Sequence, residues 1–165
     1  MTETRKEKPP KSAPEPEPAN PLHTADMPWI PSGPGNSFRP LRFATDGWSE
    51  LMRVEPGHSV ALHRHSGPVH AFNLAGKRRI LGSGELVGPG DYVYEPGGMI
   101  DGWEAVGDEP CVIHLNIVGA VEYLDGAGQV IAVADSASQR AAYLTWCREH
   151  SVAPAPQIIG DAAGY

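Results

Sequence analysis

The sequence contains only two cysteines, Cys111 and Cys147, and they do not form a Cys-x-x-Cys pair. So few cysteines argue against a disulfide-stapled secreted scaffold and fit a reducing compartment. No apolar run approaches the roughly 18 residues needed to span a bilayer. The N-terminus also lacks the apolar core of a signal peptide. These absences predict a cytoplasmic protein with no membrane partner.

Basic residues are also scarce, because 13 lysines and arginines stand against 20 acidic residues, which gives a net charge of −7. After residues 1–20 the one basic run is Lys77, Arg78 and Arg79. Nucleic acids and anionic membranes attract strongly basic surfaces, so this balance argues against both as partners. Arg78 and Arg79 are expected to be solvated charges on a strand face.

Turn-forming residues, in contrast, are abundant, with 19 glycines and 17 prolines in 165 residues. The length predicts one domain with one core. Between Pro28 and Asp135, short apolar segments alternate with turn residues roughly every 8 to 12 positions, a pattern typical of an all-β sandwich or barrel. The barrel is assigned to residues 21–134. Strands are predicted near residues 40–45, 48–55, 59–65, 69–75, 78–82, 91–95, 100–106, 111–118 and 129–133.

Three segments flank this barrel or follow it. Residues 1–20 hold five prolines and balanced charges, and are predicted to be a disordered tail. Residues 135–150 predict one C-terminal helix, because Ser136 and Gln139 match a capping box and apolar residues recur at helical spacing. Residues 151–165 are rich in Ala, Pro and Gly and are predicted to be a second tail.

The sharpest chemical pattern is a group of four histidines between His58 and His70. Because side chains alternate across a strand, His63 and His65 project to the same face, about 7 Å apart at Cα. After the turn at residues 66–68 the chain can return antiparallel and bring His70 toward this pair. Neutral imidazoles crowded in a barrel need hydrogen-bond partners or an ion. The cluster therefore predicts a metal site.

The segments around these histidines resemble the two motifs of the cupin family. The first motif, Gly, five residues, His-x-His, three or four residues, Glu and a later Gly, is matched by residues 57–76, with His70 where the family has Glu. The second motif, which ends in Pro-x-Gly, two residues, His, three residues and Asn, is matched by residues 90–101, with Asp101 where the family has His. The resemblance implies an all-β cupin fold, a double-stranded β-helix or jelly-roll barrel.

An exchange of carboxylate and imidazole between these two positions leaves three histidines and one aspartate around the ion. The predicted metal ligands are therefore His63, His65, His70 and Asp101. Asp is one methylene shorter than Glu, so Asp101 is alternatively a group that orients a histidine ring through its free N–H. Three histidines then hold the ion.

His114 competes for the third ligand position. One face of residues 111–118 is apolar and the other carries His114, so this residue approaches the ion if the polar face looks into the barrel. If Asp101 is not a ligand, it becomes an acid/base group, with Glu95 as a further candidate. Three aromatic side chains are expected to shape the substrate pocket: Phe72, Tyr94 and Trp103.

Residues 27–133 are similar to one branch of single-domain cupins, the 2,4'-dihydroxyacetophenone dioxygenase family. The phrases ALHRHSGPVHAFNLAGKRRILG and GPGDYVYEPGG carry this similarity. The resemblance implies a non-haem Fe(II) enzyme that uses dioxygen to cleave an aryl hydroxyketone between its carbonyl and hydroxymethyl carbons. The products are an aryl carboxylate and formate.

Two other functions stay open, because fold and ligands do not fix the reaction. One is a metal-dependent cupin of another class, such as an isomerase or hydrolase, and the other is a non-catalytic metal-binding sensor module. Ligand type alone does not select iron over zinc, nickel, manganese or copper. The apolar face of residues 111–118, if it points outward, favours a homodimer or higher homo-oligomer.

Overall fold

The computed structural model describes residues 19–159. Most of the predicted N-terminal tail and the last six residues of the chain lie outside the described residues. A short 3-10 helix, Thr24–Asp26, is followed by strands and two helices. Their bounds are β1 Ile30–Gly33, β2 Asn36–Ala44, β3 Gly47–Val54, β4 Ser59–His65, β5 Val69–Ala75, β6 Lys77–Ile80, β7 Leu86–Val87, β8 Tyr92–Glu95, β9 Ile100–Val106, β10 Cys111–Val118, β11 Val121–Leu124, β12 Val130–Ala134, α1 Ser136–Glu149 and α2 Pro156–Ile159.

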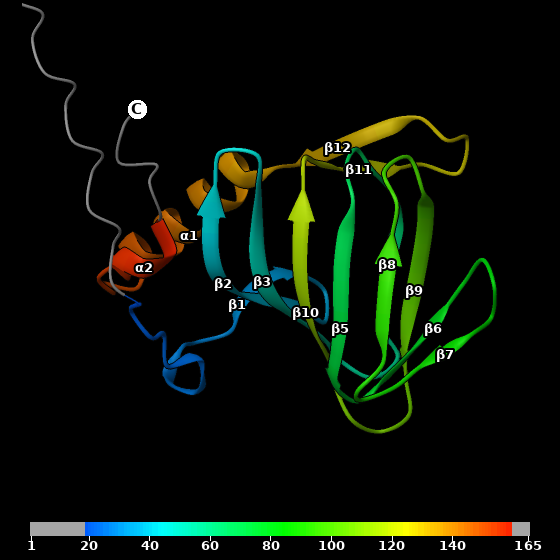
Figure 1. Ribbon diagram of the computed structural model, residues 1–165, viewed down its shortest axis with the longest axis horizontal. Coiled ribbons are helices and arrows are strands. Elements are labelled where there is room, and N and C mark those ends of the chain that lie inside the picture. The colour runs from blue at the N-terminus through cyan, green and yellow to red at the C-terminus, as the bar shows by residue number, and fades with distance from the viewer. Residues whose placement is uncertain (1–18, 160–165) are drawn as a thin grey trace, which may run out of the picture.

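The strands form two six-stranded antiparallel sheets that face each other (Figure 1). Sheet A has the order β1-β2-β3-β10-β5-β8, and sheet B has the order β12-β11-β4-β9-β6-β7. Several neighbours, such as β3 and β10 or β4 and β9, come from distant parts of the chain, so the sheets interleave as in a jelly roll. The predicted all-β class is confirmed.

Alternation along each strand decides which side chains enter the space between the sheets. In β10, Cys111, Ile113, Leu115 and Ile117 are buried and belong to the core. His114 therefore projects from the opposite, outer face of the same strand. The alternative in which the polar face of this strand looks into the barrel is wrong. The apolar face of β10 is buried in the core, so it does not support the predicted homo-oligomer, which depended on this face pointing outward.

All nine predicted strand segments correspond to strands of the structure. The sequence pattern missed β1, β7 and β11, which have four, two and four residues and are too short to show a period. The omission of β11 matters for the site, because its pairing with β4 places Tyr123 directly opposite His63.

The predicted C-terminal helix is present as α1, but a different residue caps it. Asp135 is the N-cap, and its carboxylate accepts a hydrogen bond from the Ser138 backbone N–H at 2.8 Å. The capping box thus joins Asp135 and Ser138 rather than Ser136 and Gln139. The Ser136 hydroxyl instead donates to the Ala44 carbonyl at 2.6 Å and ties the helix to β2.

The segment after α1 is not wholly a tail, because residues 156–159 form the short helix α2 with Ile158 fully buried. Both helices lie beside β2 at one end of the barrel (Figure 1). The hydroxyl of Tyr143 in α1 accepts a hydrogen bond from the Ala155 backbone N–H at 2.9 Å, which joins the two helices. Within residues 19–159, no helix has the length and apolar character needed to cross a bilayer.

Candidate metal centre

The two histidines of the His-x-His segment lie side by side inside the barrel. His63 and His65 are 5% and 4% exposed, because their positions in β4 alternate with Leu62 and Arg64 on the outer face. Their Nε2 atoms are 3.1 Å apart, and the two rings meet edge to face at a centroid distance of 4.7 Å.

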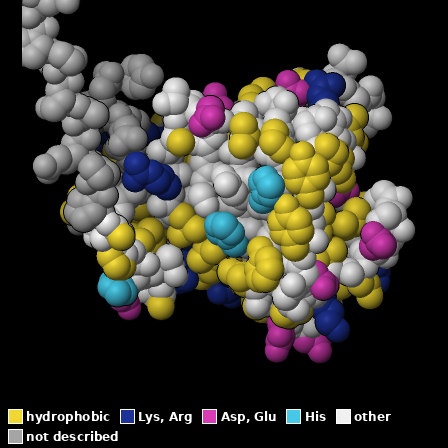
Figure 2. Space-filling view, viewed as in Figure 1, with side chains coloured by type: hydrophobic (Ala, Val, Ile, Leu, Met, Phe, Trp, Pro, Cys, Tyr) yellow, Lys and Arg dark blue, Asp and Glu magenta, His cyan; other side chains and the backbone are white. Residues whose placement is uncertain are grey.

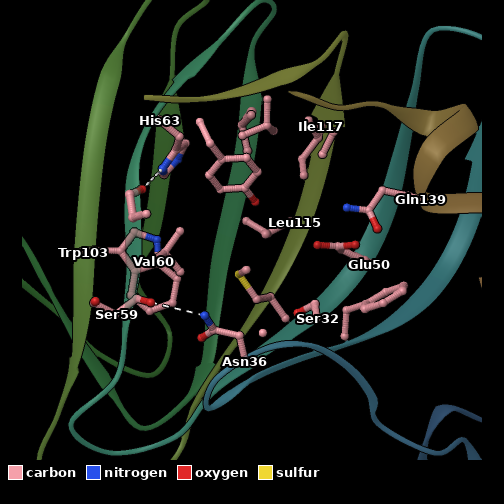
Figure 3. Close-up of a pocket in the computed structure, with 18 of the residues that line it drawn as sticks. Ser32, Asn36, Glu50, Ser59, Val60, His63, Trp103, Leu115, Ile117 and Gln139 are labelled. Carbon is pink, nitrogen blue, oxygen red and sulfur yellow. Dashed lines mark hydrogen bonds between the residues drawn. The ribbon is translucent and has the colours of Figure 1, made fainter. Parts of the chain in front are cut away.

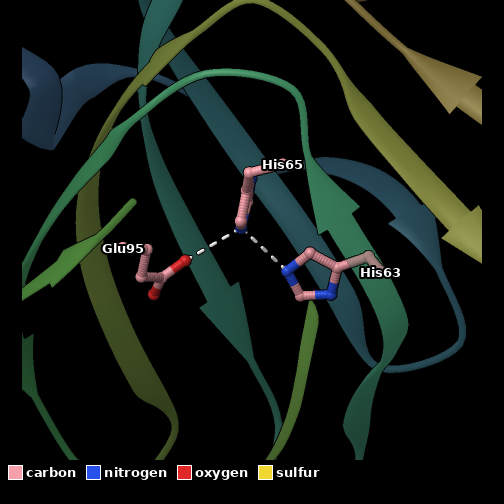
Figure 4. A group of neighbouring side chains, drawn as sticks. All are labelled: His63, His65 and Glu95. Atoms are coloured by element: carbon pink, nitrogen blue, oxygen red, sulfur yellow. Dashed lines mark hydrogen bonds and ion pairs between the residues drawn. The ribbon is translucent and has the colours of Figure 1, made fainter. Parts of the chain in front are cut away.

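Glu95 joins this pair from the opposite sheet. It ends β8 at the edge of sheet A, it is 4% exposed, and its Oε2 lies 2.8 Å from His65 Nε2 (Figure 4). One donor atom from each of His63, His65 and Glu95 lies within 4.8 Å of the others. Two imidazoles and one carboxylate in this arrangement are a donor set suited to a divalent transition metal.

The hydrogen bond of His63 to the backbone fixes the tautomer of the imidazole ring that a metal ligand needs. His63 Nδ1 lies 2.8 Å from the Ala61 carbonyl oxygen, which only accepts, so Nδ1 carries the proton. The Nε2 lone pair of the neutral ring then points toward His65 and Glu95. Burial also lowers the pKa of His63 and keeps the ring neutral. A metal ligand of this type is oriented in just this way, by a carbonyl on its second nitrogen.

Arg78 supplies the positive charge next to the carboxylate. Its guanidinium Nη1 lies 3.7 Å from Glu95 Oε1, and the side chain is 1% exposed and packs over the Trp103 ring at 5.2 Å. Burial alone would raise the pKa of Glu95, but the hydrogen bond with His65 and the charges of His65 and Arg78 outweigh it and lower that pKa.

The expectation that Arg78 is a solvated surface charge is therefore wrong. In β6 the burial alternates, so Arg78 points inward whereas Arg79 points outward and pairs with the exposed Glu104 at 2.9 Å. A run of three basic residues hides this difference, because the run does not show which positions of the strand face the core.

Asp101 lies beside the cluster without belonging to it. It stands directly opposite His63 in the β4–β9 ladder and is 4% exposed. Its Oδ1 accepts the Gly102 backbone N–H at 2.7 Å. Burial raises its pKa. The second nitrogen of His63 bonds to the Ala61 carbonyl and not to Asp101, so Asp101 does not orient that ring through its N–H as expected, and its role as an acid/base group stays a prediction.

Two of the predicted histidine ligands lie on the outer face of sheet A. His70 is exposed and its Nδ1 lies 2.7 Å from Tyr92 Oη, because the turn before β5 sends Val69 inward and His70 outward. His114 Nε2 lies 3.0 Å from the Ser49 hydroxyl on the same outer face, where partial burial lowers its pKa. The structure does not bring either residue to His63.

The aromatic pocket residues divide in the same way. Trp103 is 4% exposed and lines the cavity, and its role in binding a substrate stays a prediction, whereas Phe72 and Tyr94 are 42% and 53% exposed. Figure 2 looks onto sheet A from outside and shows histidine and apolar side chains at that surface. The assignment of Phe72 and Tyr94 to the pocket is wrong, because both share the outward phase of His70 in paired strands.

A cavity of about 710 Å³ opens between the two sheets at this cluster. His63, His65 and Glu95 line it together with Leu115 and Ile117 of β10. Figure 3 shows His63 on one side of the cavity and Leu115 and Ile117 on another. This volume is in the range of sites for small molecules. The donor atoms therefore face a space large enough for a substrate.

Sequence reasoning did not place Glu95 among the ligands and overlooked Glu50, which also lines the cavity. Both residues have an inward phase in their strands, Glu95 one residue after the exposed Tyr94 and Glu50 two after the buried Trp48. The alternation was visible in the sequence, but which side of each strand faces the core was not, because that depends on how the two sheets pack. A carboxylate on an inward-facing strand position is the pattern that marks both.

Solved structures similar to this chain share its fold. A cupin protein from Ralstonia eutropha JMP134 is 21% identical over 84% of this chain and 93% of its own, with a TM-score of 0.78. The acetylacetone dioxygenase of Acinetobacter johnsonii is 22% identical over 78% and 98%, with a TM-score of 0.65. A Rhodobacter sphaeroides structure of SigE in complex with the anti-sigma ChrR is 21% identical over 56% and 50%, with a TM-score of 0.51.

These likenesses confirm the cupin fold expected from the two sequence motifs. None of the curated proteins matches the sequence. A family model does match, over residues 19–120, and it describes the ChrR cupin-like domain. This match spans β1 to β10, including all three residues of the cluster. The chain therefore belongs to the ChrR cupin-like domain family.

Proposed function

We propose that the protein is an Fe(II)-dependent dioxygenase whose iron is held by His63, His65 and Glu95. The observation that carries the proposal is the convergence of these three buried donor atoms within 4.8 Å at the wall of a cavity of about 710 Å³. Two histidines and one carboxylate with further positions open are the donor set typical of non-haem Fe(II) oxygenases.

Buried polar atoms without partners support a ligand at this place. Among the described residues, His65 Nδ1 and Arg78 Nη2 are buried and have no hydrogen-bond partner. Unpaired buried groups of this kind are costly unless an ion, water or substrate satisfies them. Their position next to the three donor atoms therefore fits a site built for a metal and a polar ligand.

The proposed reaction divides between the metal and the protein. Bound iron would supply Lewis-acid polarisation of the substrate oxygens and would carry electron density from the substrate, which is the reductant, to dioxygen. His63 and His65 hold the ion from one strand, Glu95 lowers its net charge, and Arg78 offsets that carboxylate. Asp101, directly opposite His63, keeps its predicted role as the acid/base group, whereas Glu95 moves from that role to the ligands.

The substrate class in the proposal is an aryl hydroxyketone of the 2,4'-dihydroxyacetophenone type. The bond between the carbonyl and hydroxymethyl carbons breaks, and both atoms of dioxygen enter the products, one aryl carboxylate and one formate. The aromatic and aliphatic wall formed by Trp103, Leu115 and Ile117 suits the ring and excludes water. Similarity of residues 27–133 to that enzyme family supports the same substrate.

The test begins with the bound metal, measured by elemental analysis of the purified protein. The protein is then loaded with Fe(II) under argon, exposed to oxygenated buffer with 2,4'-dihydroxyacetophenone, and followed with an oxygen electrode and a formate assay. One formate per dioxygen consumed is the expected result. Retained iron with no oxygen uptake across hydroxyacetophenones would overturn the proposal.

One specific observation favours a second candidate, a metal-binding module without turnover. The family model describes a domain of ChrR, and the ChrR structure similar to this chain is that of an anti-sigma factor bound to SigE. Tightly held zinc and no turnover in the same experiment would support this candidate. Conversion of substrate without oxygen uptake would instead point to a cupin isomerase or hydrolase.

A further inference from the structure

The cavity carries a second buried polar group on the wall opposite the metal cluster. Glu50 belongs to β3 of sheet A, whereas His63 and His65 belong to β4 of sheet B. Glu50 is 5% exposed, and Figure 3 shows its carboxyl directed into the cavity, with His63 on the far side. Nothing in the proposed reaction uses this carboxyl.

The neighbours of Glu50 hold the carboxyl in place but leave part of it free. Trp48 Nε1 donates a hydrogen bond to Glu50 Oε2 at 2.9 Å. The residues directly opposite Glu50 in the adjacent strands are Leu115 and Pro40, whose side chains have no donor to offer. A carboxyl has two oxygens with several acceptor sites, so one indole N–H does not exhaust it. Among the described residues no other hydrogen bond engages this carboxyl, so its Oε1 is available to a ligand in the cavity.

The space between Glu50 and the metal cluster is shaped for a ring. Trp103 and Tyr123 both line it, and the Tyr123 ring lies 6.1 Å from the His63 ring. Aromatic walls favour flat apolar groups through offset stacking and edge contacts. A molecule with a chelating group at His63 and an aromatic body therefore directs its far end toward sheet A.

We propose that Glu50 is a specificity-determining residue that binds a hydroxyl group on the end of the aromatic ligand remote from the metal. The ligand class is a small aromatic with chelating oxygens at one end and a hydrogen-bond donor at the other. This inference rests on the proposed function for the position of the chelating end. The Glu50 subsite itself is defined by Glu50, Trp48 and the apolar wall.

The protonation of Glu50 agrees with this role. Burial raises its pKa to about 7 although the hydrogen bond from Trp48 acts in the opposite direction. Near neutral pH the carboxyl is therefore ionised in only part of the molecules. Its free oxygen can accept a hydrogen bond from a hydroxyl in either state. A ligand carboxylate at this end would meet repulsion from the ionised form, so an anionic tail is disfavoured.

Two ligands that differ only in the ring hydroxyl test the inference: 2,4'-dihydroxyacetophenone and 2-hydroxyacetophenone. Their dissociation constants are measured by calorimetry on the Zn(II)-loaded protein, because zinc is not redox-active and leaves the ligands intact. The wild type is expected to bind the ring-hydroxylated ligand about tenfold more tightly. Glu50→Leu is expected to remove this preference, and Glu50→Gln to reduce it to a few-fold.

Glu104→Gln is the matched control, because it makes the same chemical change at an exposed carboxylate of β9. It is expected to keep the full tenfold preference. An unchanged preference in a folded Glu50→Leu protein would overturn the inference. The carboxyl stretching band of the wild type gives a second measurement that needs no variant. It is expected to shift with the ring-hydroxylated ligand alone, and a shift of equal size with both ligands also counts against the inference.

The same ligands distinguish this inference from the proposed function. Metal-free protein is expected to keep a preference for the ring hydroxyl, since Glu50 lies outside the metal cluster. If the protein prefers the ring-hydroxylated ligand but shows no oxygenase activity, the role of Glu50 is supported and the dioxygenase proposal is refuted. Oxygen uptake with both ligands and equal affinity refutes the role of Glu50 alone.

Discussion

His65 Nε2 and Glu95 Oε2 lie 2.8 Å apart, and the two residues come from opposite sheets of the barrel. The pair exists only when sheet A and sheet B are packed together. An ion bound here links the two sheets and stabilises the folded state by an amount that grows with the logarithm of its concentration relative to the dissociation constant. Metal binding and fold stability are therefore coupled.

His63→Ala and His65→Ala are each expected to abolish metal retention and the rise in melting temperature on metal addition. Each substitution removes one of three ligands, and the remaining two do not hold a divalent ion through purification. Elemental analysis and thermal unfolding measure the two effects. His70→Ala is the control, because His70 lies on the outer face of sheet A and bonds to Tyr92. Loss of metal in this control would contradict the proposed site.

Glu95 and Asp101 are expected to differ in their effect on metal affinity. Glu95→Gln removes the charged ligand and is expected to leave no stoichiometric metal. Asp101→Asn alters a neighbour of His63 and is expected to weaken affinity by about 10- to 100-fold while binding survives. Competition with a chelator of known affinity measures both. Equal losses in the two variants would make Asp101 a ligand.

The common orientation of His63 and His65 could be predicted from the sequence because one strand carries both residues. The two-residue period places His63 and His65 on one face whatever the rest of the fold does. His70 and Glu95 depend on longer-range geometry. The turn between β4 and β5 sets the phase of His70, and the packing of the sheets brings Glu95 to His65. Neither the orientation of His70 nor the contact of Glu95 with His65 can be predicted from the spacing of residues along the sequence.

Which face of β10 is buried could not be predicted from the sequence either. Its apolar and polar faces were evident, but only the neighbouring sheet decides which face is inside. The buried apolar face places Leu115 at the cavity and His114 outside. By contrast, the all-β class and the position of α1 follow from turn residues and helical spacing, which are local properties.

Arg78→Met is expected to lower the free energy of unfolding by about 3 to 5 kcal/mol, because it leaves the buried Glu95 carboxylate without its cation. Arg79→Met, one residue further in the same strand, breaks an exposed pair with Glu104 and is expected to cost under about 1 kcal/mol. Urea unfolding of the metal-free proteins compares the two. Equal costs would show that Arg78 is not the buried partner of Glu95.

Glu50 is expected to make stability depend on pH between about 4.5 and 7. Its pKa is raised from 4.5 to about 7 by burial, so the folded state holds a proton that the unfolded chain has released. The stabilisation from this proton is complete below pH 4.5 and is lost as the pH rises to 7, on the order of 3 kcal/mol in all.

The comparison with Glu50→Gln isolates this contribution from that of the histidines. The difference in unfolding free energy between wild type and variant is expected to shift against the wild type by that amount from pH 4.5 to 7, and then to stay level. Burial, and after it the charge of Glu50, raise the pKa of Tyr123, so its hydroxyl stays neutral throughout. A difference independent of pH would show that Glu50 is ionised in the folded protein.

The C-terminal helix does more than cover the barrel, because Gln139 and Ala142 of α1 form part of the cavity wall. The helix is tied to β2 through Ser136 and to the segment after it through Tyr143. A chain shortened before Asp135 would leave the ligand chamber open to water at this end. Recombinant forms intended for binding studies therefore need the sequence through Ile159, and affinity tags belong at the other terminus.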